Sequence, residues 1–335
     1  MLFQSNRPYC GMEFSENSSA TQYTPHATLL RQLLISSLMA LAMFFLCVGK
    51  SLAAEHIIQM TAEEVHEDGF GSKLMAYKML SHTVNGTNIT HRYSNHATIP
   101  GPTLFLTEGD TVNLTIYNDI PGANAGVLKG ISSQVSVHVH GVHYKIVSDG
   151  TLKVINQEDD QGAGVGPAQT HANYSYTWDV APGTAGTWAY HDHNYETHNG
   201  AEHKGLFGAI IVNPVGAANY AKEFVLYLTD DAFWGMEIDS HGMKQKKHGI
   251  NPDFIARKDS EVRFHLIALG TDIHKFKLSG YQWADPGTNN MINEVAIGPL
   301  EKHVFTVKAT KNAQYSDENF TNKLMGMVGK LKVSH

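Results

Sequence analysis

The stretch PTLFLTEGDTVNLTI at residues 102–116 aligns without a gap on PDFIARKDSEVRFHL at residues 252–266. Each copy has the pattern of a strand, a turn at Gly109-Asp110 or Asp259-Ser260, and a second strand in which apolar and polar residues alternate. An internal repeat of this kind predicts two similar β-domains within one chain.

A second repeated stretch closes each copy. GLFGAIIV at 205–212 matches GMVGKLKV at 326–333, and each is expected to be a closing strand. The small, turn-rich segment at 213–219 follows the first of them and is the natural domain boundary. We therefore expect a first domain at 54–214 and a second domain at 215–335.

The remaining sequence is typical of an all-β protein. Between Glu55 and His335, short alternating segments are separated by Gly, Asn and Pro turns, with no clear amphipathic helix. This pattern predicts antiparallel β-sandwiches or barrels. The hydrophobic content of 42% and the charged content of 17% are those of a globular protein. A net charge of −7 gives no reason to expect a nucleic-acid partner.

The N-terminal segment at 1–53 has the features of a secretory signal peptide. Arg31 precedes an apolar run at 33–49, and Ser51-Leu52-Ala53 supplies the small residues at which a signal peptidase would cut. An uncleaved membrane anchor is the alternative, because the run is close to the length that can span a bilayer. We expect cleavage, a periplasmic or secreted protein, and no stable membrane insertion afterwards.

Cleavage would also remove both cysteines of the chain, Cys10 and Cys47. The exported protein would then have neither disulfides nor thiolate metal ligands. Any metal would have to be bound by nitrogen and oxygen donors.

Two His-x-His pairs, His138-Val139-His140 and His191-Asp192-His193, are the candidate metal ligands. Side chains alternate along a strand, so both imidazoles of a pair point the same way. In VSVHVH at 135–140 the three valines share the opposite face, which suits a core. Two such strands side by side would assemble a four-imidazole metal site. Hydrogen-bonded strand histidines without a metal are the alternative, and three further histidines are weaker candidates: His143, His198 and His203.

With these residues the chain resembles the multicopper oxidases, particularly the bacterial two-domain, laccase-like members. The resemblance covers nearly all of residues 55–335, and it implies two cupredoxin-like Greek-key β-sandwich domains. The matching residues are Tyr144 and the stretches HVHG at 138–141, SDGT at 148–151, GTWAYHDH at 186–193 and GLFG at 205–208.

The resemblance also implies copper as the cofactor. In that family the paired histidines bind a trinuclear copper cluster that reduces dioxygen. The match implies that His138 serves the type 2 copper, and that His140, His191 and His193 serve the type 3 pair. Imidazole also suits zinc, nickel and iron, so a zinc hydrolase is the alternative reading of the ligands alone.

The second domain departs from the family pattern. Where the family has His-x-x-His-x-His-Gly and Tyr-His-Cys-His, this chain has HKFKLSG at 274–280 and YSDE at 315–318. His274 alone keeps a type 1 position, Asp317 replaces the thiolate ligand, and the remaining type 1 positions fall on Asn322 and Met327. The positions of the cluster histidines are occupied by Lys277, Ser279, Ser316 and Glu318.

This departure has chemical consequences. A blue copper centre needs a thiolate together with imidazoles, so we expect neither a blue centre nor ordinary laccase turnover. We expect Asp192 and Asp317 to orient neighbouring groups by hydrogen bonds. Lys277 either replaces the charge of a lost copper or is an ordinary solvated lysine. His143 stands where relatives often have an acid.

Three classes of function follow from these observations. The first is a copper-dependent oxidoreductase without a type 1 centre, using a small-molecule reductant or dioxygen. The second is a non-catalytic copper carrier or buffer. The third is a partner subunit of an intact multicopper oxidase, with a second cupredoxin chain as its partner. The resemblance also implies a homotrimer in which neighbouring chains complete the cluster.

Overall fold

The two strands of each repeated stretch lie in different sheets. In the first copy they are β4 (Thr103–Thr107) and β5 (Thr111–Asn118), and in the second copy β14 (Asp253–Arg257) and β15 (Glu261–Ala268). The turns between them contain Gly109 at φ 100° and Asp259 at φ 63°. Both turns therefore lie where the sequence predicts them.

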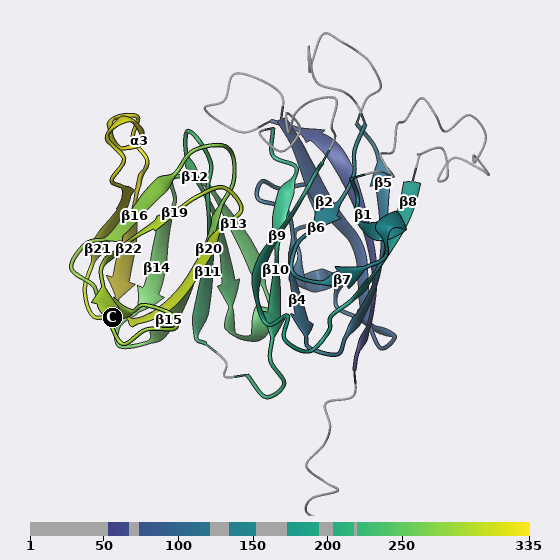
Figure 1. The fold of residues 1–335 in the computed structure, drawn as a ribbon, viewed down its shortest axis with the longest axis horizontal. Coiled ribbons are helices and arrows are strands. Elements are labelled where there is room, and N and C mark those ends of the chain that lie inside the picture. The colour runs from purple at the N-terminus through teal and green to yellow at the C-terminus, as the bar shows by residue number, and fades with distance from the viewer. Residues whose placement is uncertain (1–52, 67–73, 121–133, 152–172, 194–203, 218–219) are drawn as a thin grey trace, which may run out of the picture. The chain divides into compact units, whose positions relative to one another are not determined.

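The computed structural model describes residues 53–66, 74–120, 134–151, 173–193, 204–217 and 220–335, all within one compact unit, Leu52–His335 (Figure 1). The predicted signal segment, His198 and His203 lie outside the described residues. In the described part of the chain, no helix has the length and apolar character needed to cross a membrane.

The first sandwich consists of a 6-stranded sheet in the order β3-β2-β1-β5-β8-β7 and a 4-stranded sheet in the order β4-β10-β9-β6. The strands not yet delimited are β1 (Glu55–Val65), β2 (Leu74–Val84), β3 (Thr87–Asn88), β6 (His138–Val139), β7 (His143–Tyr144), β8 (Asn173–Asp179), β9 (Gly186–His191) and β10 (Phe207–Asn213). Two 3-10 turns accompany them, η1 (Thr90–Arg92) and η2 (Ile146–Ser148).

The second sandwich consists of two 5-stranded sheets in the orders β13-β12-β11-β15-β20 and β14-β22-β21-β16-β19, with a small ribbon of β17 and β18. Its remaining elements are β11 (Lys222–Leu228), β12 (Phe233–Asp239), β13 (Gln245–Ile250), β16 (His274–Leu278), β17 (Trp283–Ala284), β18 (Met291–Ile292), β19 (Glu294–Ile297), β20 (Lys302–Lys308), β21 (Ala313–Asp317), β22 (Val328–Ser334), η5 (Ser240–Gly242) and α3 (Phe320–Leu324).

The repeat extends to individual contacts in the two sandwiches. The Tyr190 hydroxyl donates to the carbonyl of Pro102 at 2.6 Å, and the Tyr315 hydroxyl donates to the carbonyl of Pro252. Each tyrosine ring packs against a glycine of the closing strand, Gly208 in the first sandwich and its counterpart in the second, where a Cβ would collide with the ring. The two prolines occupy equivalent positions in the sequence alignment, and so do the two glycines. The structure therefore confirms the register of that alignment.

The sheets are mainly antiparallel, as predicted, but each sandwich also has parallel pairs. β1 pairs with β5 in parallel, and β4 pairs with β10 in parallel; the second sandwich repeats both arrangements. In β4–β10 and β14–β22, the first strand of each repeated stretch pairs with the closing strand, and most of the sandwich lies between them in sequence. The expected scarcity of helix holds among the described residues, where α3 is five residues long and exposes Phe320 and Leu324.

Each sandwich has its own apolar core. Val135, Val137 and Val139 lie in the core of the first sandwich, as the alternation of the VSVHVH stretch predicts. A separate cluster rich in phenylalanine fills the second sandwich. A third cluster joins the two, because residues of β9 and β10 pack against residues of β11 and β12. The domain boundary at 214/215 stays a prediction, and it falls between β10 and β11.

Candidate metal centre

The two His-x-His pairs lie on neighbouring strands. β6 and β9 pair in antiparallel register, and His138 stands directly opposite His191. Tyr190 and Val139 occupy the next register position and point into the core. The histidines therefore share the opposite face of this sheet, as strand alternation requires.

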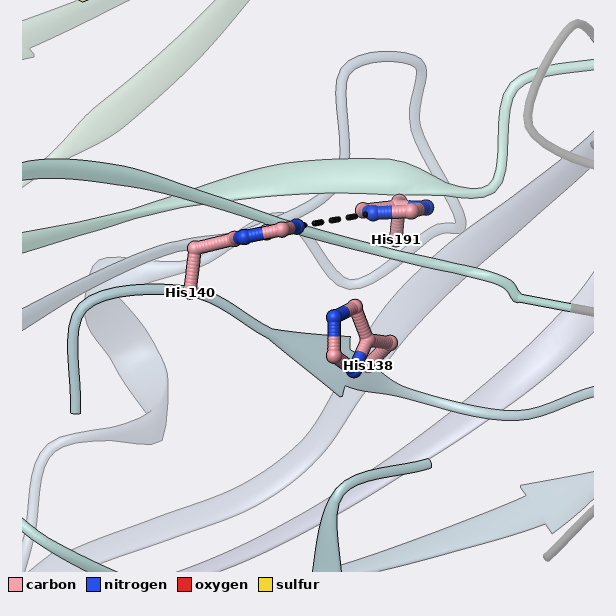
Figure 2. A group of neighbouring side chains, drawn as sticks. All are labelled: His138, His140 and His191. Atoms are coloured by element: carbon pink, nitrogen blue, oxygen red, sulfur yellow. Dashed lines mark hydrogen bonds between the residues drawn. The ribbon is translucent and has the colours of Figure 1, made fainter. Parts of the chain in front are cut away.

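Three of the four histidines bring ring nitrogens together (Figure 2). One nitrogen each of His138, His140 and His191 lies within 4.8 Å of the others, and the Nε2 atoms of His140 and His191 are 3.1 Å apart. Metal–imidazole bonds of about 2.0–2.1 Å place two ligand nitrogens on one ion about 3 Å apart. The spacing of this pair therefore fits a shared metal ion.

Hydrogen bonds on the far side of two rings select the nitrogen that is available. Nδ1–H of His138 donates to the carbonyl of Asp149, and Nδ1–H of His191 donates to the carbonyl of Asp192 at 2.9 Å. A carbonyl oxygen only accepts, so Nδ1 carries the proton in both rings and Nε2 presents its lone pair. Such bonds are typical of metal-ligating histidines.

The SDGT stretch at 148–151 holds the carbonyl that orients His138. The Asp149 carboxylate accepts from the backbone N–H and the hydroxyl of Thr151, at 2.8 and 2.7 Å. Gly150 has φ 80°, and a Cβ there would collide with the backbone of Val137. In the sequence, only the family resemblance marks this stretch. In the structure it supplies the carbonyl that orients the His138 ring.

The electrostatics of the cluster favour neutral imidazoles. Burial lowers the pKa of His138. Burial, together with the neighbouring imidazoles and Lys302, lowers the pKa of His140 to about 3. Metal binding requires an unprotonated nitrogen, so these two rings are in the ligand form at neutral pH.

His193 lies beside the cluster rather than in it. Its ring centroid is 5.2 Å from that of His138 and 5.7 Å from that of His191, and its Nδ1 is buried without a hydrogen-bond partner. Its backbone N–H donates to the Ser136 hydroxyl at 2.9 Å, and the carboxylate of Asp192 accepts from the Ser136 N–H at 2.7 Å. An orphaned buried nitrogen next to three converging imidazoles fits a fourth ligand.

The other histidine candidates lie elsewhere. His143 is exposed on β7 in the 6-stranded sheet and is not part of the nitrogen cluster. His198 and His203 are outside the described residues.

The multicopper oxidase family model matches residues 81–216, which carry all four histidines. Together with the comparisons below, this match supports a multicopper oxidase-family protein. The same comparisons support copper as the metal cofactor and a copper-binding, oxidoreductase-like protein.

Two curated proteins with laccase or nitrite-reductase names are similar to this chain in sequence. A probable nitrite reductase-hydroxylamine oxidoreductase fusion protein of Kuenenia stuttgartiensis is 29% identical over 221 residues, which cover 62% of this chain and 24% of that protein. Laccase-8 of Oryza sativa subsp. japonica is 29% identical over 147 residues, which cover 41% of this chain and 22% of that protein. The chain thus spans about a quarter of the length of these relatives.

Solved structures share the fold. A multicopper oxidase crystal structure aligns with a TM-score of 0.56 and 20% identity, covering 84% of this chain and 88% of that one. A copper nitrite reductase from Nitrosomonas europaea aligns with a TM-score of 0.54 and 16% identity, covering 83% and 94%. These likenesses confirm the cupredoxin β-sandwich fold that the sequence predicts.

The second sandwich has no imidazoles at the positions equivalent to the cluster. The Lys277 ammonium lies 3.6 Å from the Glu294 carboxylate. The Ser316 hydroxyl donates to Glu318 at 2.7 Å, and Glu318 also pairs with Lys323 at 2.8 Å. Lys277 and Ser316 stand opposite each other in register, as His138 and His191 do. Lys277 thus forms an ion pair with Glu294, and its proposed electrostatic role stays a prediction.

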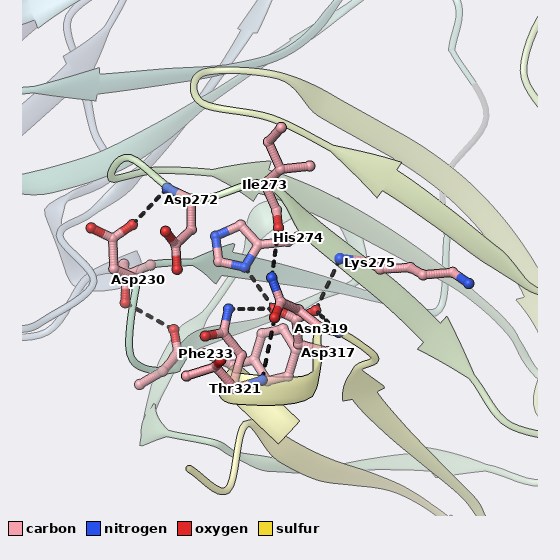
Figure 3. A network of polar contacts seen from close by, with 12 residues as sticks. Asp230, Phe233, Asp272, Ile273, His274, Lys275, Asp317, Asn319 and Thr321 are labelled. Carbon is pink, nitrogen blue, oxygen red and sulfur yellow. Dashed lines mark hydrogen bonds and ion pairs between the residues drawn. The ribbon is translucent and has the colours of Figure 1, made fainter. Parts of the chain in front are cut away.

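The type 1 position is a hydrogen-bonded cluster of buried side chains (Figure 3). The Asp317 carboxylate accepts from Nδ1–H of His274 and from the Asn322 amide, both at 2.8 Å, and from the backbone N–H of Lys275 at 2.9 Å. Met327 is fully buried. The donor set contains no thiolate and therefore does not fit a blue copper centre.

Asp192 and Asp317 make the same contact in the two sandwiches. Asp192 accepts from the backbone N–H of Ser136, and Asp317 from that of Lys275, the equivalent position. Burial raises the pKa of Asp317, but the hydrogen bonds it accepts outweigh burial and hold it at about 2. Both carboxylates thus orient neighbouring groups, as the sequence predicts. Sequence reasoning missed Ser136 as the partner of Asp192, although Ser136 shares a face with His138.

Proposed function

We propose that the chain is an exported copper oxidoreductase that works without a blue copper centre. Copper would be held by His138, His140, His191 and His193. The observation that carries this proposal is the 3.1 Å separation of the Nε2 atoms of His140 and His191, with His138 beside them. Bound copper would supply a one-electron couple and an open coordination position for a small molecule.

Each protein group has a defined task in this proposal. The carbonyls of Asp149 and Asp192 hold the protons of His138 and His191 on Nδ1, so that Nε2 faces the metal. Burial keeps His138 and His140 unprotonated at neutral pH. Ser136 and Asp192 fix the backbone at His193.

Electrons would have to reach this copper directly from the reductant. The type 1 position offers His274, Asp317, Asn322 and Met327 and no thiolate, so the usual entry point for electrons is missing. Nitrite and dioxygen are the acceptors to test first, because the relatives named above include a probable nitrite reductase fusion and a laccase.

Copper quantification with electron paramagnetic resonance and visible absorption tests the metal site. We expect at least one copper per chain and a non-blue spectrum. We also expect His191→Ala to lose the copper. His143→Ala is the matched control, since His143 is an exposed histidine outside the cluster. Zinc in place of copper, or full copper retention in His191→Ala, would refute the site.

Turnover separates an enzyme from a copper carrier. Consumption of nitrite or dioxygen with a phenol or metal-ion reductant should require His191 and leave His143→Ala unaffected. Reversible copper binding without any turnover would instead assign a carrier or buffer. N-terminal sequencing of the protein from a periplasmic or culture-medium fraction tests export, and a start other than residue 54 would correct the cleavage site.

Assembly is the remaining part of the proposal. We propose a homotrimer in which the second sandwich of one subunit faces the histidines of the next. Its contributing side chains would be Lys277, Ser279, Ser316 and Glu318. Light scattering of the purified protein should give three times the chain mass, and a monomer would contradict this arrangement.

A partner subunit is the second candidate. It is favoured by the ion pair of Lys277 and the Ser316–Glu318 bond, because these positions of the chain contribute no imidazole. A full cluster would then need histidines from another protein. Co-purification of a cysteine-containing cupredoxin chain from the native host would support this candidate.

A further inference from the structure

A pocket of about 700 Å³ lies apart from the histidine cluster, between residues 91–98 of the first sandwich and residues 244–247 at the start of β13. Gln245 ties the two sides together, because its side-chain amide accepts from the N–H of Thr103 at 2.8 Å and donates to the carbonyl of Thr103 at 2.6 Å. This volume lies within the range of small-molecule sites.

The pocket is strongly cationic. Arg92 and three lysines line it together with two histidines, and no acidic side chain is among the lining residues that the structure describes. This is a local excess of positive charge on a chain whose net charge is −7. The lining lysines are Lys244, Lys246 and Lys247, and the histidines are His91 and His96.

Arg92 has unused donors. Its Nε is buried without a hydrogen-bond partner, and its guanidinium forms no ion pair with a described residue. A buried donor without a partner is unfavourable, more so on a charged group. A planar guanidinium binds carboxylate and phosphate groups through paired hydrogen bonds. Arg92 is therefore suited to an oxyanion entering the pocket.

The wall behind Arg92 is held by a chain of side-chain hydrogen bonds. Tyr93 OH lies 2.7 Å from Nδ1 of His82, Nε2 of His82 lies 2.9 Å from Nδ1 of His56, and Nε2 of His56 lies 3.1 Å from the Asp110 carboxylate. The ionised carboxylate only accepts, so a consistent set of donors runs from Tyr93 through both rings to Asp110. This chain fixes Tyr93, the neighbour of Arg92, from the core side.

The floor of the pocket is apolar. Met79 and Met236 are both 3% exposed and line it from the two sandwiches, beside the Tyr93 side chain. A lining that combines apolar side chains with cations matches a ligand with an apolar body and an anionic head.

We propose that this pocket binds a small organic anion whose carboxylate or phosphate group pairs with Arg92, Lys244 and Lys246. Its apolar body would lie against Met79, Tyr93 and Met236. None of the lining residues is a member of the histidine cluster, so the proposal does not depend on copper.

Isothermal titration of the full chain with phthalate and with phenyl phosphate, at matched ionic strength, tests the proposal. Both probes are aromatic dianions, so a difference between them identifies carboxylate or phosphate as the preferred head group. At least one should bind saturably with one site per chain, and neutral dimethyl phthalate should not bind. If neither dianion binds saturably, the proposal is wrong.

Variants locate the site. Arg92→Gln should weaken binding by about tenfold or more, since a charge-assisted bond is worth about 1.5–3 kcal/mol. Lys308→Gln removes the same charge from an exposed lysine outside the pocket and should leave binding unchanged. If Arg92→Gln fails to fold, the exposed pair Lys244→Gln and Lys246→Gln replaces it. An equal effect of the pocket and control variants would overturn the proposal.

Discussion

The ammonium group of Lys302 lies over the indole ring of Trp188, 3.2 Å from the ring centroid. Lys302 begins β20 of the second sandwich, and Trp188 lies on β9, the strand that carries His191. The contact therefore links the second sandwich to the strand of the metal cluster. The same lysine contributes to the lowered pKa of His140, after burial and the neighbouring imidazoles.

Lys302→Met should destabilise the protein by about 0.5–1 kcal/mol, the range for a cation–π contact at an exposed site. Denaturant unfolding of the metal-free protein measures this change. Lys308→Met is the matched control, because Lys308 lies on the same strand and has only an exposed ion pair with Asp259. Copper binding at neutral pH should not weaken, since removing a nearby positive charge favours a cation. Weaker copper binding in Lys302→Met alone would contradict this account.

Asp192→Ala should loosen the metal site and the fold together. The variant leaves the buried N–H of Ser136 without its acceptor, at a cost of about 1–3 kcal/mol. His193 would lose the support of Ser136, so copper affinity should fall by about 10–100-fold, as for other groups that orient metal ligands. Asp192→Asn keeps an acceptor oxygen and should retain most of the stability and most of the copper affinity. Competition with a copper chelator measures the affinity, and equal values for the two variants would argue against this role.

Acid should destabilise the protein through Asp317 and Glu237. Both carboxyls are partly desolvated, but their hydrogen bonds hold each pKa at about 2, below the ordinary values of 3.8 and 4.5. A carboxyl whose pKa is depressed in the folded state stabilises the protein at pH values above its ordinary pKa. This stabilisation is lost as the pH falls toward the depressed pKa. Unfolding free energy should therefore fall between about pH 4.5 and pH 2.

For Asp317 this contribution is roughly 2 kcal/mol at neutral pH. Asp317→Asn should be less stable at pH 7 and should show a shallower fall with acid. Chemical denaturation at a series of pH values measures both slopes. Parallel curves for the variant and the parent chain would show that Asp317 does not carry this dependence.

Two substitutions should create a blue copper centre in the second sandwich. Asp317→Cys with Asn322→His would place a thiolate and a second imidazole beside His274 and Met327, which are already buried there. With Cu(II) the double variant should show intense absorption in the red, from the copper–thiolate bond. Asp317→Cys alone should not develop a stable band, and absence of the band in the double variant would show that these four positions do not converge on a metal.

The sequence predicted much of this structure, for identifiable reasons. The repeat at 102–116 and 252–266 fixes the turns at Gly109 and Asp259, because each copy has a turn between two alternating segments. Strand alternation fixes the faces on which His138 and His191 lie. Once the two strands pair, both histidines point to one shared site.

Other features depend on contacts that no local pattern encodes. The Asp149 carbonyl that orients His138 lies directly after the 3-10 turn η2, and the parallel pairing of β4 with β10 depends on the whole sandwich. The pocket around Arg92 needs residues more than 140 positions apart to meet, as the Gln245–Thr103 bond shows. Such long-range partners follow from tertiary packing and could not be predicted from spacing.

The shared carboxylate contact of Asp192 and Asp317 bears on the order of maturation. In both sandwiches a hydrogen bond from a backbone amide to an aspartate anchors the backbone beside the ligand positions. These bonds are made by the protein alone, so we expect the folded chain to form first and to acquire copper as a late step. Removal of the copper should then leave the fold intact and ready to be loaded again.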